Sequence, residues 1–194
     1  MKTQTKLVSL IVVSSALLSA AWAAPKDLSW QPNKALLNQL APVTAAGQYR
    51  IQPPKGYVLQ TRPGPSGSAA QAWVGAPRTD GTRSYIMLTT LVPPAGEETK
   101  YTLSQVSDKL LAGVQGRRKD WKQAPSESGT VNGMTFVRTY WRATDTATGA
   151  AMHGFSYVGQ DGKGFVQISS QDVEPHSKTT LQLTEASALT FKKP

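Results

Sequence analysis

The chain has 194 residues and a formal net charge of +9 at pH 7, from 21 Lys and Arg against 12 Asp and Glu. An excess of cations favours anionic partners such as lipid headgroups, acidic polysaccharide or nucleic acid, although net charge bears first on solubility. The absence of cysteine excludes disulfides, thiolate zinc sites, cysteine nucleophiles and the lipid-bearing cysteine of a bacterial lipoprotein.

The first 23 residues have the pattern of a Sec-type signal peptide. Lys2 and Lys6 precede an apolar run (7–18), and Ala21-Trp22-Ala23 fits the small-x-small rule for cleavage. A membrane-spanning helix needs about 20 apolar residues, and this run is shorter. We therefore expect cleavage after Ala23 and a secreted or periplasmic protein with no integral membrane segment. Removing the two lysines lowers the formal charge from +9 to +7.

The remaining 171 residues are enough for one domain. Residues 24–48 contain three prolines and little periodicity, which indicates a loosely docked N-terminal arm with one helical turn near Lys34 to Leu40. From Tyr49 the pattern changes to short apolar segments between turns, so residues 49–194 are expected to form the single folded domain.

Four extended segments open this domain. YRI (49–51) and YVLQTR (57–62) are joined by a proline–glycine turn. QAWVGAP (71–77) and TRSYIMLTTLV (82–92) flank Asp80-Gly81, which is typical of a β-hairpin turn. The pattern therefore predicts at least one hairpin.

A capped helix is predicted next, from Thr102 to Gly116. Thr102 and Gln105 have capping-box spacing, Tyr101 and Val106 can form a hydrophobic staple, and Gly116 is a suitable end. The apolar stripe at helical spacing consists of Leu103, Val106, Leu110 and Val114.

Four further strands and a second helix (177–191) complete the chain. Asn132-Gly133 separates the segments 121–131 and 134–144 with a typical hairpin turn, and polar turns separate 150–158 from 163–171. The order strands, helix, strands, helix favours an α+β fold: an antiparallel sheet of about six to seven strands in hairpins and a meander, with two main helices packed on it.

This pattern resembles the PsbP-like domains. The residues that carry the resemblance are YRIQPPKGY (49–57), the capped middle helix, the meander and the closing LTEASALTFKK (183–193). The resemblance covers Tyr49 to Lys193 and implies an α/β/α sandwich, a fold that includes secreted bacterial relatives of the DcrB and LpqN type. It also implies an accessory or binding role without catalysis, and it carries over no functional residue.

The stretch SQDVEPHS (170–177) holds two carboxylates and one of the two histidines of the chain. In an extended segment Asp172, Glu174 and His176 point to one side, and with His153 they form a set that zinc can use. His153, Asp172 and His176 are therefore the candidate site of an envelope hydrolase or a metal-dependent enzyme.

A simpler interpretation of the same stretch is a strand end, a polar turn (172–174) and a helix start led by Pro175. Asp, Glu, Pro and Ser are typical of helix N-termini. His153 shares a predicted strand face with Phe155 and Tyr157, which is typical of a half-buried, hydrogen-bonded histidine. We favour this interpretation and expect no catalytic residue and no metal site. The interpretations differ in whether His153 and His176 face a common cavity.

The segment GRRKDWK (116–122) places cations and an aromatic residue directly after the predicted helix. Cations beside an aromatic ring can hold phosphate or stack on a base or a sugar, whereas cations at a helix C-terminus also simply offset its negative end. Arg138 and Arg142 share a predicted strand face with Tyr140 and can extend the patch. The candidate anionic-partner patch consists of Arg117, Arg118, Lys119, Trp121 and Lys122.

Together these patterns favour a secreted or periplasmic accessory or binding domain without catalytic activity, whose partner is a protein or another envelope component. Two alternatives remain open. One is the hydrolase or metal-dependent enzyme that uses His153, Asp172 and His176, and the other is a polyanion-binding protein that uses Arg117 to Lys122. We expect no cofactor, and nucleic acid is not an expected partner.

Overall fold

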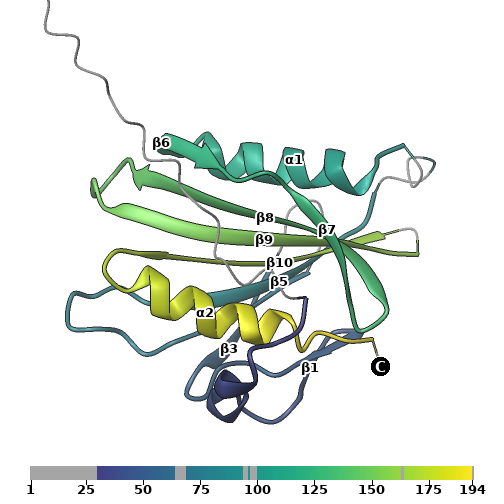
Figure 1. Ribbon diagram of the computed structural model, residues 1–194, viewed down its shortest axis with the longest axis horizontal. Helices are drawn as coiled ribbons and strands as arrows, with labels where there is room; N and C mark the ends of the chain where they lie inside the picture. Colours follow the sequence, from purple (N-terminus) through teal and green to yellow (C-terminus); the bar gives the residue numbers. More distant parts are fainter. Residues whose placement is uncertain (1–29, 64–68, 94–95, 97–99, 163, 194) are drawn as a thin grey trace, which may run out of the picture.

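The computed structural model describes residues 30–63, 69–93, 96, 100–162 and 164–193 (Figure 1). The predicted signal peptide and the start of the predicted arm lie outside these residues. No helix in the described part of the chain is long and apolar enough to span a bilayer.

An eight-stranded antiparallel sheet forms the centre of the molecule, in the order β3-β4-β5-β10-β9-β8-β6, with β7 paired to β8. Its strands are β3 (Val58–Pro63), β4 (Ala69–Val74), β5 (Tyr85–Leu91), β6 (Arg118–Gln123), β7 (Glu127–Val131), β8 (Met134–Asp145), β9 (Ala151–Asp161) and β10 (Gly164–Val173). The other elements are η1 (Lys34–Gln39), the hairpin β1 (Thr44–Ala46) and β2 (Tyr49–Ile51), and the helices α1 (Leu103–Gln115) and α2 (Ser177–Ala188).

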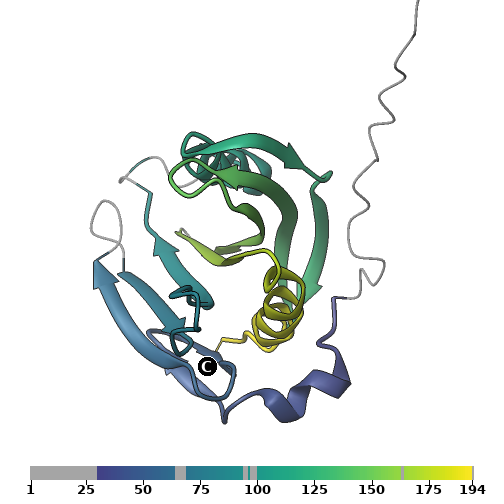
Figure 2. The same cartoon turned by 90° about the vertical axis from the view of Figure 1, so that its left-hand side faces the viewer.

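The two helices lie on opposite faces of the sheet. The strand period of two sends Phe155 and Tyr157 of β9 into the core beneath α2, while Met152 packs with Leu111 of α1. Figure 2 shows the sheet curving around α2. The expected α+β class is confirmed, and the predicted strand 121–131 is divided into β6 and β7 on either side of Pro125, which has no N–H for the ladder.

Helix α1 begins as predicted. The Thr102 hydroxyl accepts a hydrogen bond from the Gln105 amide at 3.3 Å, and Gln105 Oε1 accepts one from the Thr102 amide at 2.9 Å, which completes the capping box. Gly116 is the C-cap with right-handed backbone angles. Only Ser107 and Leu111 of α1 are buried, so this helix lies on the sheet along a narrow stripe and leaves part of the face uncovered.

The described part of the arm is packed rather than loosely docked, which corrects the prediction for residues 30–48. Leu40 and Ala46 are buried, and Trp30 packs edge-on against Tyr157 with ring centroids 5.6 Å apart. Trp30 also lies so close to Gly129 of β7 that a Cβ at Gly129 would come within 1.9 Å of its ring. A glycine in β7 is therefore required for the arm to reach the core.

We expect Gly129→Ala to lower the free energy of unfolding by about 1–3 kcal/mol, because the added methyl group displaces Trp30. Urea unfolding of Gly129→Ala, Trp30→Ala and the double variant measures this. In the Trp30→Ala background the same Gly129→Ala change should cost little, because the clash is gone. Additive losses in the double variant would contradict this account of the contact.

Candidate functional site

A cleft of about 670 Å³ lies between α1 and the uncovered part of the sheet. Helix α1 packs on β9, β8 and β6, and residues of β4, β5 and β10 line the opening beside it. This volume is in the range of small-molecule binding sites, which is roughly 300–1,000 Å³.

Small side chains form the floor of the cleft. Ala72, Met87, Ser169 and Ser156 are neighbours across β4, β5, β10 and β9 in the strand register, and three of these four are small. Ser156 is buried and accepts a hydrogen bond from Gln167 Nε2 at 3.0 Å. The hollow therefore follows from the sequence of the floor, since larger side chains at these positions would fill it.

Trp141 closes one side of the cleft, and Trp121 stacks on it from outside the lining. A Cβ at Gly154 of β9 would come within 2.3 Å of the Trp141 ring, so the glycine lets this indole lie close against the neighbouring strand. Trp121 stacks on Trp141 with ring centroids 4.9 Å apart, and Leu111 of α1 packs in the same cluster. These contacts hold α1 over β8 and β9 and away from β4 and β5.

The rim of the cleft is basic. Arg83, Lys109, Arg117 and Arg118 line it, and none of the described lining residues is acidic. Arg118 is paired with Asp145 at 3.1 Å, and the Lys109 ammonium lies 3.8 Å from the centroid of the Tyr101 ring. Arg117 Nε donates to the Gly113 carbonyl at 3.2 Å. Within the described part of the chain neither Arg83 nor Arg117 forms an ion pair.

Arg83 and Arg117 belong to the same end of the sheet. Arg83 lies two residues before Tyr85, the first residue of β5, and Tyr85 pairs with Gln171 near the end of β10. Arg117 directly precedes β6, whose first residue pairs with Asp145 at the end of β8. Because the ends of β8 and β10 lie at one side of the sheet, the mouth of the cleft is framed by two arginines from distant parts of the chain.

The structure divides the predicted anionic-partner patch. Arg117 and Arg118 line the cleft, while Lys119 and Lys122 are exposed on β6. Residues 118–123 form an edge strand, whose register shifts between Lys119 and Lys122, and not a solvated extension of the helix. Trp121 is half-buried against Trp141, so its ring packs inside the protein.

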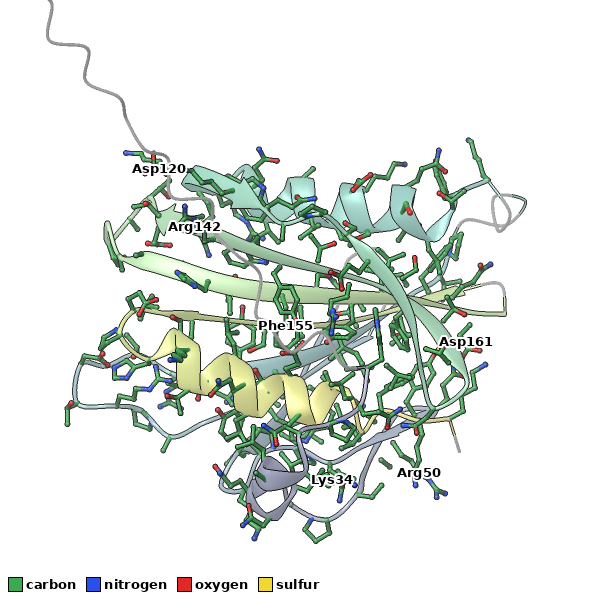
Figure 3. The ribbon with its side chains drawn as sticks, in the orientation of Figure 1. Lys34, Arg50, Asp120, Arg142, Phe155 and Asp161 are labelled. Atoms are coloured by element: carbon green, nitrogen blue, oxygen red, sulfur yellow. The ribbon has the colours of Figure 1, made fainter. Side chains whose placement is uncertain are left out.

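Two predicted additions to the patch differ from one another. Arg142 is half-buried on β8 opposite Lys122, and Figure 3 shows it with Asp120 at the end of the sheet where α1 leads into β6. Arg138 does not extend the patch, because its side chain is only 1 % exposed and pairs with Glu127 at 2.9 Å.

The candidate residues His153, Asp172 and His176 each contact a different partner. The buried Asp172 carboxylate accepts hydrogen bonds from both Arg78 Nη atoms, at 2.9 and 2.5 Å. His176 Nε2 lies 3.0 Å from Asp80, and His153 Nε2 lies 3.3 Å from Glu174. Among the described residues, no three His, Cys, Asp or Glu side chains are placed to hold a metal ion.

The predicted polar turn at 172–174 is wrong in its boundaries. Strand β10 continues to Val173, so Asp172 is a strand residue that binds Arg78 and Thr180 rather than a capping residue. His176 is the N-cap of α2, without a side-chain capping bond. Glu174 accepts a hydrogen bond from the Ser177 hydroxyl at 2.8 Å, a contact between side chains that satisfies no backbone N–H of the helix.

Asp80 is held in its charged form. Hydrogen bonds from the side chain and the backbone amide of Thr82 lower the pKa of Asp80 to about 2, and His176 adds to this effect. The Asp80–His176 pair connects the loop before β5 to the turn before α2, and the Arg78–Asp172 pair connects the same loop to the end of β10. These titratable groups therefore join two segments of the fold.

Sequence reasoning missed Arg83, Gly113 and the cleft itself. Arg83 alternates with Tyr85 and Met87, which is a detectable strand pattern, and Gly113 interrupts an otherwise good helix-forming segment. The cleft could not be found this way, because its walls come from α1 and from strands that precede and follow it by many residues.

No protein-family model matches the sequence, and no curated protein matches it. The structure is similar to cyanobacterial PsbP (CyanoP) from Synechocystis sp. PCC 6803, with a TM-score of 0.56 and 12% identity over 90% of this chain and 99% of that one. It is less similar to the Ran-binding protein Mog1p of Saccharomyces cerevisiae (TM-score 0.49, 11% identity, 76% and 90% covered). It is less similar again to LpqN, involved in cell envelope biogenesis of Mycobacterium tuberculosis (TM-score 0.37, 8% identity, 78% and 82% covered).

The likeness to cyanobacterial PsbP extends over nearly the whole of both chains, at an identity that shows the fold alone. It agrees with the antiparallel sheet between α1 and α2 and with the resemblance seen in the sequence. This chain therefore has the PsbP-like α/β/α sandwich fold.

Proposed function

We propose that this protein is a secreted or periplasmic binding domain without catalytic activity, which takes an organic anion in the cleft beside α1. The observation that carries the proposal is the composition of this cleft: four cationic side chains and no acidic one among its described lining residues. The extracytoplasmic location rests on the predicted signal peptide.

Charge complementarity favours an anion. Cations around a cleft with apolar walls focus the field and raise the local concentration of anions. The guanidinium groups of Arg83 and Arg117 are available for this role, because in the described residues no carboxylate neutralises them. Arginine is also well suited to bind carboxylate or phosphate through two parallel hydrogen bonds.

The absence of catalysis is supported by the partners of the candidate residues. Asp172 is engaged by Arg78 and Thr180, and the two histidines are engaged by two different carboxylates. Each group thus takes part in a contact between segments of the fold, which is a structural role.

The polyanion alternative retains one observation in its favour. Lys122 of β6 lies opposite Arg142 of β8, and Lys119 precedes it on the same edge strand. These cations lie outside the cleft, so variants of Lys119 and Lys122 separate a surface patch for polyanions from the cleft.

Isothermal titration calorimetry of residues 24–194 tests the proposal with three anions: dodecanoate, 1-naphthalenesulfonate and tetraglutamate. For each anion that binds, Arg83→Glu with Arg117→Glu should weaken the affinity at least about tenfold, since contacts to charged groups are worth roughly 1.5–3 kcal/mol each. The matched control, Lys119→Glu with Lys122→Glu, removes the same net charge and should change the affinity by less than about twofold, given salt screening.

Two results would overturn the proposal. One is that none of the three anions binds. The other is an equal loss of affinity in both double variants, which would assign binding to the net charge or to the β6 surface and not to the cleft.

A second prediction concerns the proposed structural role of the acidic residues. Asp172→Asn should lower the free energy of unfolding by roughly 3 kcal/mol, because it leaves Arg78 without its buried charge partner. Anion affinity should remain unchanged in the same variant, measured by calorimetry at a temperature where it is folded. A loss of anion binding with unchanged stability would contradict the structural role.

Acid unfolding tests Asp80. Its folded-state pKa of about 2 is below the ordinary value of about 3.9 in an unfolded chain. The corresponding stabilisation is therefore present above about pH 4 and is lost as the pH falls toward 2. Asp80→Asn should be less stable than the parent protein at pH 6 and equally stable at pH 2, as measured by urea unfolding at both values. A difference between the proteins that does not depend on pH would contradict this.

A further inference from the structure

The walls of the cleft are mainly apolar. Helix α1 presents Leu110, Leu111 and Val114, and the sheet presents Ala72, Val74 and Met87. Of these six, Leu110, Val114, Val74 and Met87 are only partly buried. An apolar ligand between the walls would remove this surface from water, which is favourable in proportion to the area covered.

Gly113 makes room on the helix side. It lies within α1, where glycine is less favourable than alanine, and it lines the cleft. A Cβ at this position would meet no atom within 4 Å. The glycine therefore leaves open space between Leu110 and Val114 that any larger residue would occupy.

On both walls an arginine at the mouth is followed inward by apolar side chains, and the other cation of the helix wall, Lys109, lies farther along α1 with its ammonium over the Tyr101 ring. On the sheet side Arg83 stands at the mouth, and Tyr85 and Met87 follow along the chain. On the helix side Arg117 stands at the mouth, and Val114 and Leu110 precede it by three and seven residues, which is about one and two helical turns. A ligand that satisfies both walls has an anionic end and an apolar body.

We propose that the anion bound in this cleft is a single-chain amphiphile, which rests on the binding function proposed above. Its carboxylate or phosphate head lies between Arg83 and Arg117, and its hydrocarbon chain runs along Gly113 between α1 and strands β4 and β5. The polar groups of the floor are compatible with this arrangement. Gln167 is engaged with Ser156, and Gln171 lies opposite Tyr85 at the mouth, where its amide can donate to the head.

The first test is a chain-length series. Hexanoate, octanoate, decanoate and dodecanoate, each below its micelle concentration, are titrated into residues 24–194 by calorimetry. The affinity should tighten by up to about fourfold for each added methylene, the value for full burial, until the chain fills the cleft. Dodecan-1-ol, which has no charge, should bind at least about tenfold more weakly than dodecanoate.

The second test uses a matched pair of helix variants. Gly113→Leu should weaken dodecanoate binding at least about tenfold by filling the space of the chain. It should also raise or preserve the melting temperature, because leucine is a better helix former than glycine. Ala112→Leu adds a similar side chain at an exposed position next in sequence that does not line the cleft, and it should leave dodecanoate binding unchanged.

A titration with monododecyl phosphate tests whether the anionic head of the ligand is a carboxylate or a phosphate. Tighter binding of dodecanoate indicates a fatty acid, and tighter binding of the phosphate indicates a phosphate-headed lipid. Either order supports the amphiphile, provided that Gly113→Leu weakens both.

Different results would overturn the amphiphile and the anion-binding function on which it rests. If tetraglutamate or 1-naphthalenesulfonate binds through Arg83 and Arg117 while carboxylate affinity does not rise with chain length, the amphiphile is wrong and the anion-binding function stands. Unchanged dodecanoate affinity in Gly113→Leu also overturns the amphiphile, since the chain then lies elsewhere. If no anion binds, both are wrong.

Discussion

The arrangement of the molecule depends on the close approach of Trp141 to the backbone of β9 at Gly154. A side chain at residue 154 would displace this indole and disturb its contacts with Trp121 and Leu111. Because α1 buries little else, its packing against these tryptophans decides which strands the helix covers. The cleft over β4, β5 and β10 is the part of the sheet that remains once α1 is held to one side.

The two faces of the sheet therefore differ in kind. Beneath α2 the core is a continuous group of large apolar and aromatic side chains that includes Trp73, Phe136, Phe155 and Phe191, and its packing fixes the fold. Beneath α1 the central strands carry small and polar side chains that provide little packing of their own. A protein with one well-packed face can leave the other partly open without losing its structure, and open concave surfaces are where ligands bind.

Local signals predicted the architecture well. The turns at Asp80-Gly81 and Asn132-Gly133 and the capping box at Thr102 act over a few residues, so their patterns are legible in one sequence. Residues 118–120, the first half of β6, were not predicted as a strand, because their charges are typical of an edge strand and not of a buried one. Asp172 was assigned to a turn, since its partner Arg78 is distant in sequence. The cleft could not be predicted for the same reason, because only the pairing of the strands brings Arg83 and Arg117 to the same end of the sheet.

The buried Arg138 also determines which segments of the protein can detach from the fold separately. Its buried guanidinium lies 2.9 Å from Glu127 of β7, 3.2 Å from the Tyr157 hydroxyl of β9 and 3.6 Å from Glu185 of α2, and the Trp30 ring covers it at 4.5 Å. Detaching α2 or the arm alone would leave this charge without part of its compensation in a site that water does not reach, which is costly. The arm, β7 and α2 are therefore coupled into one cooperative unit, and none of these contacts to Arg138 comes from α1.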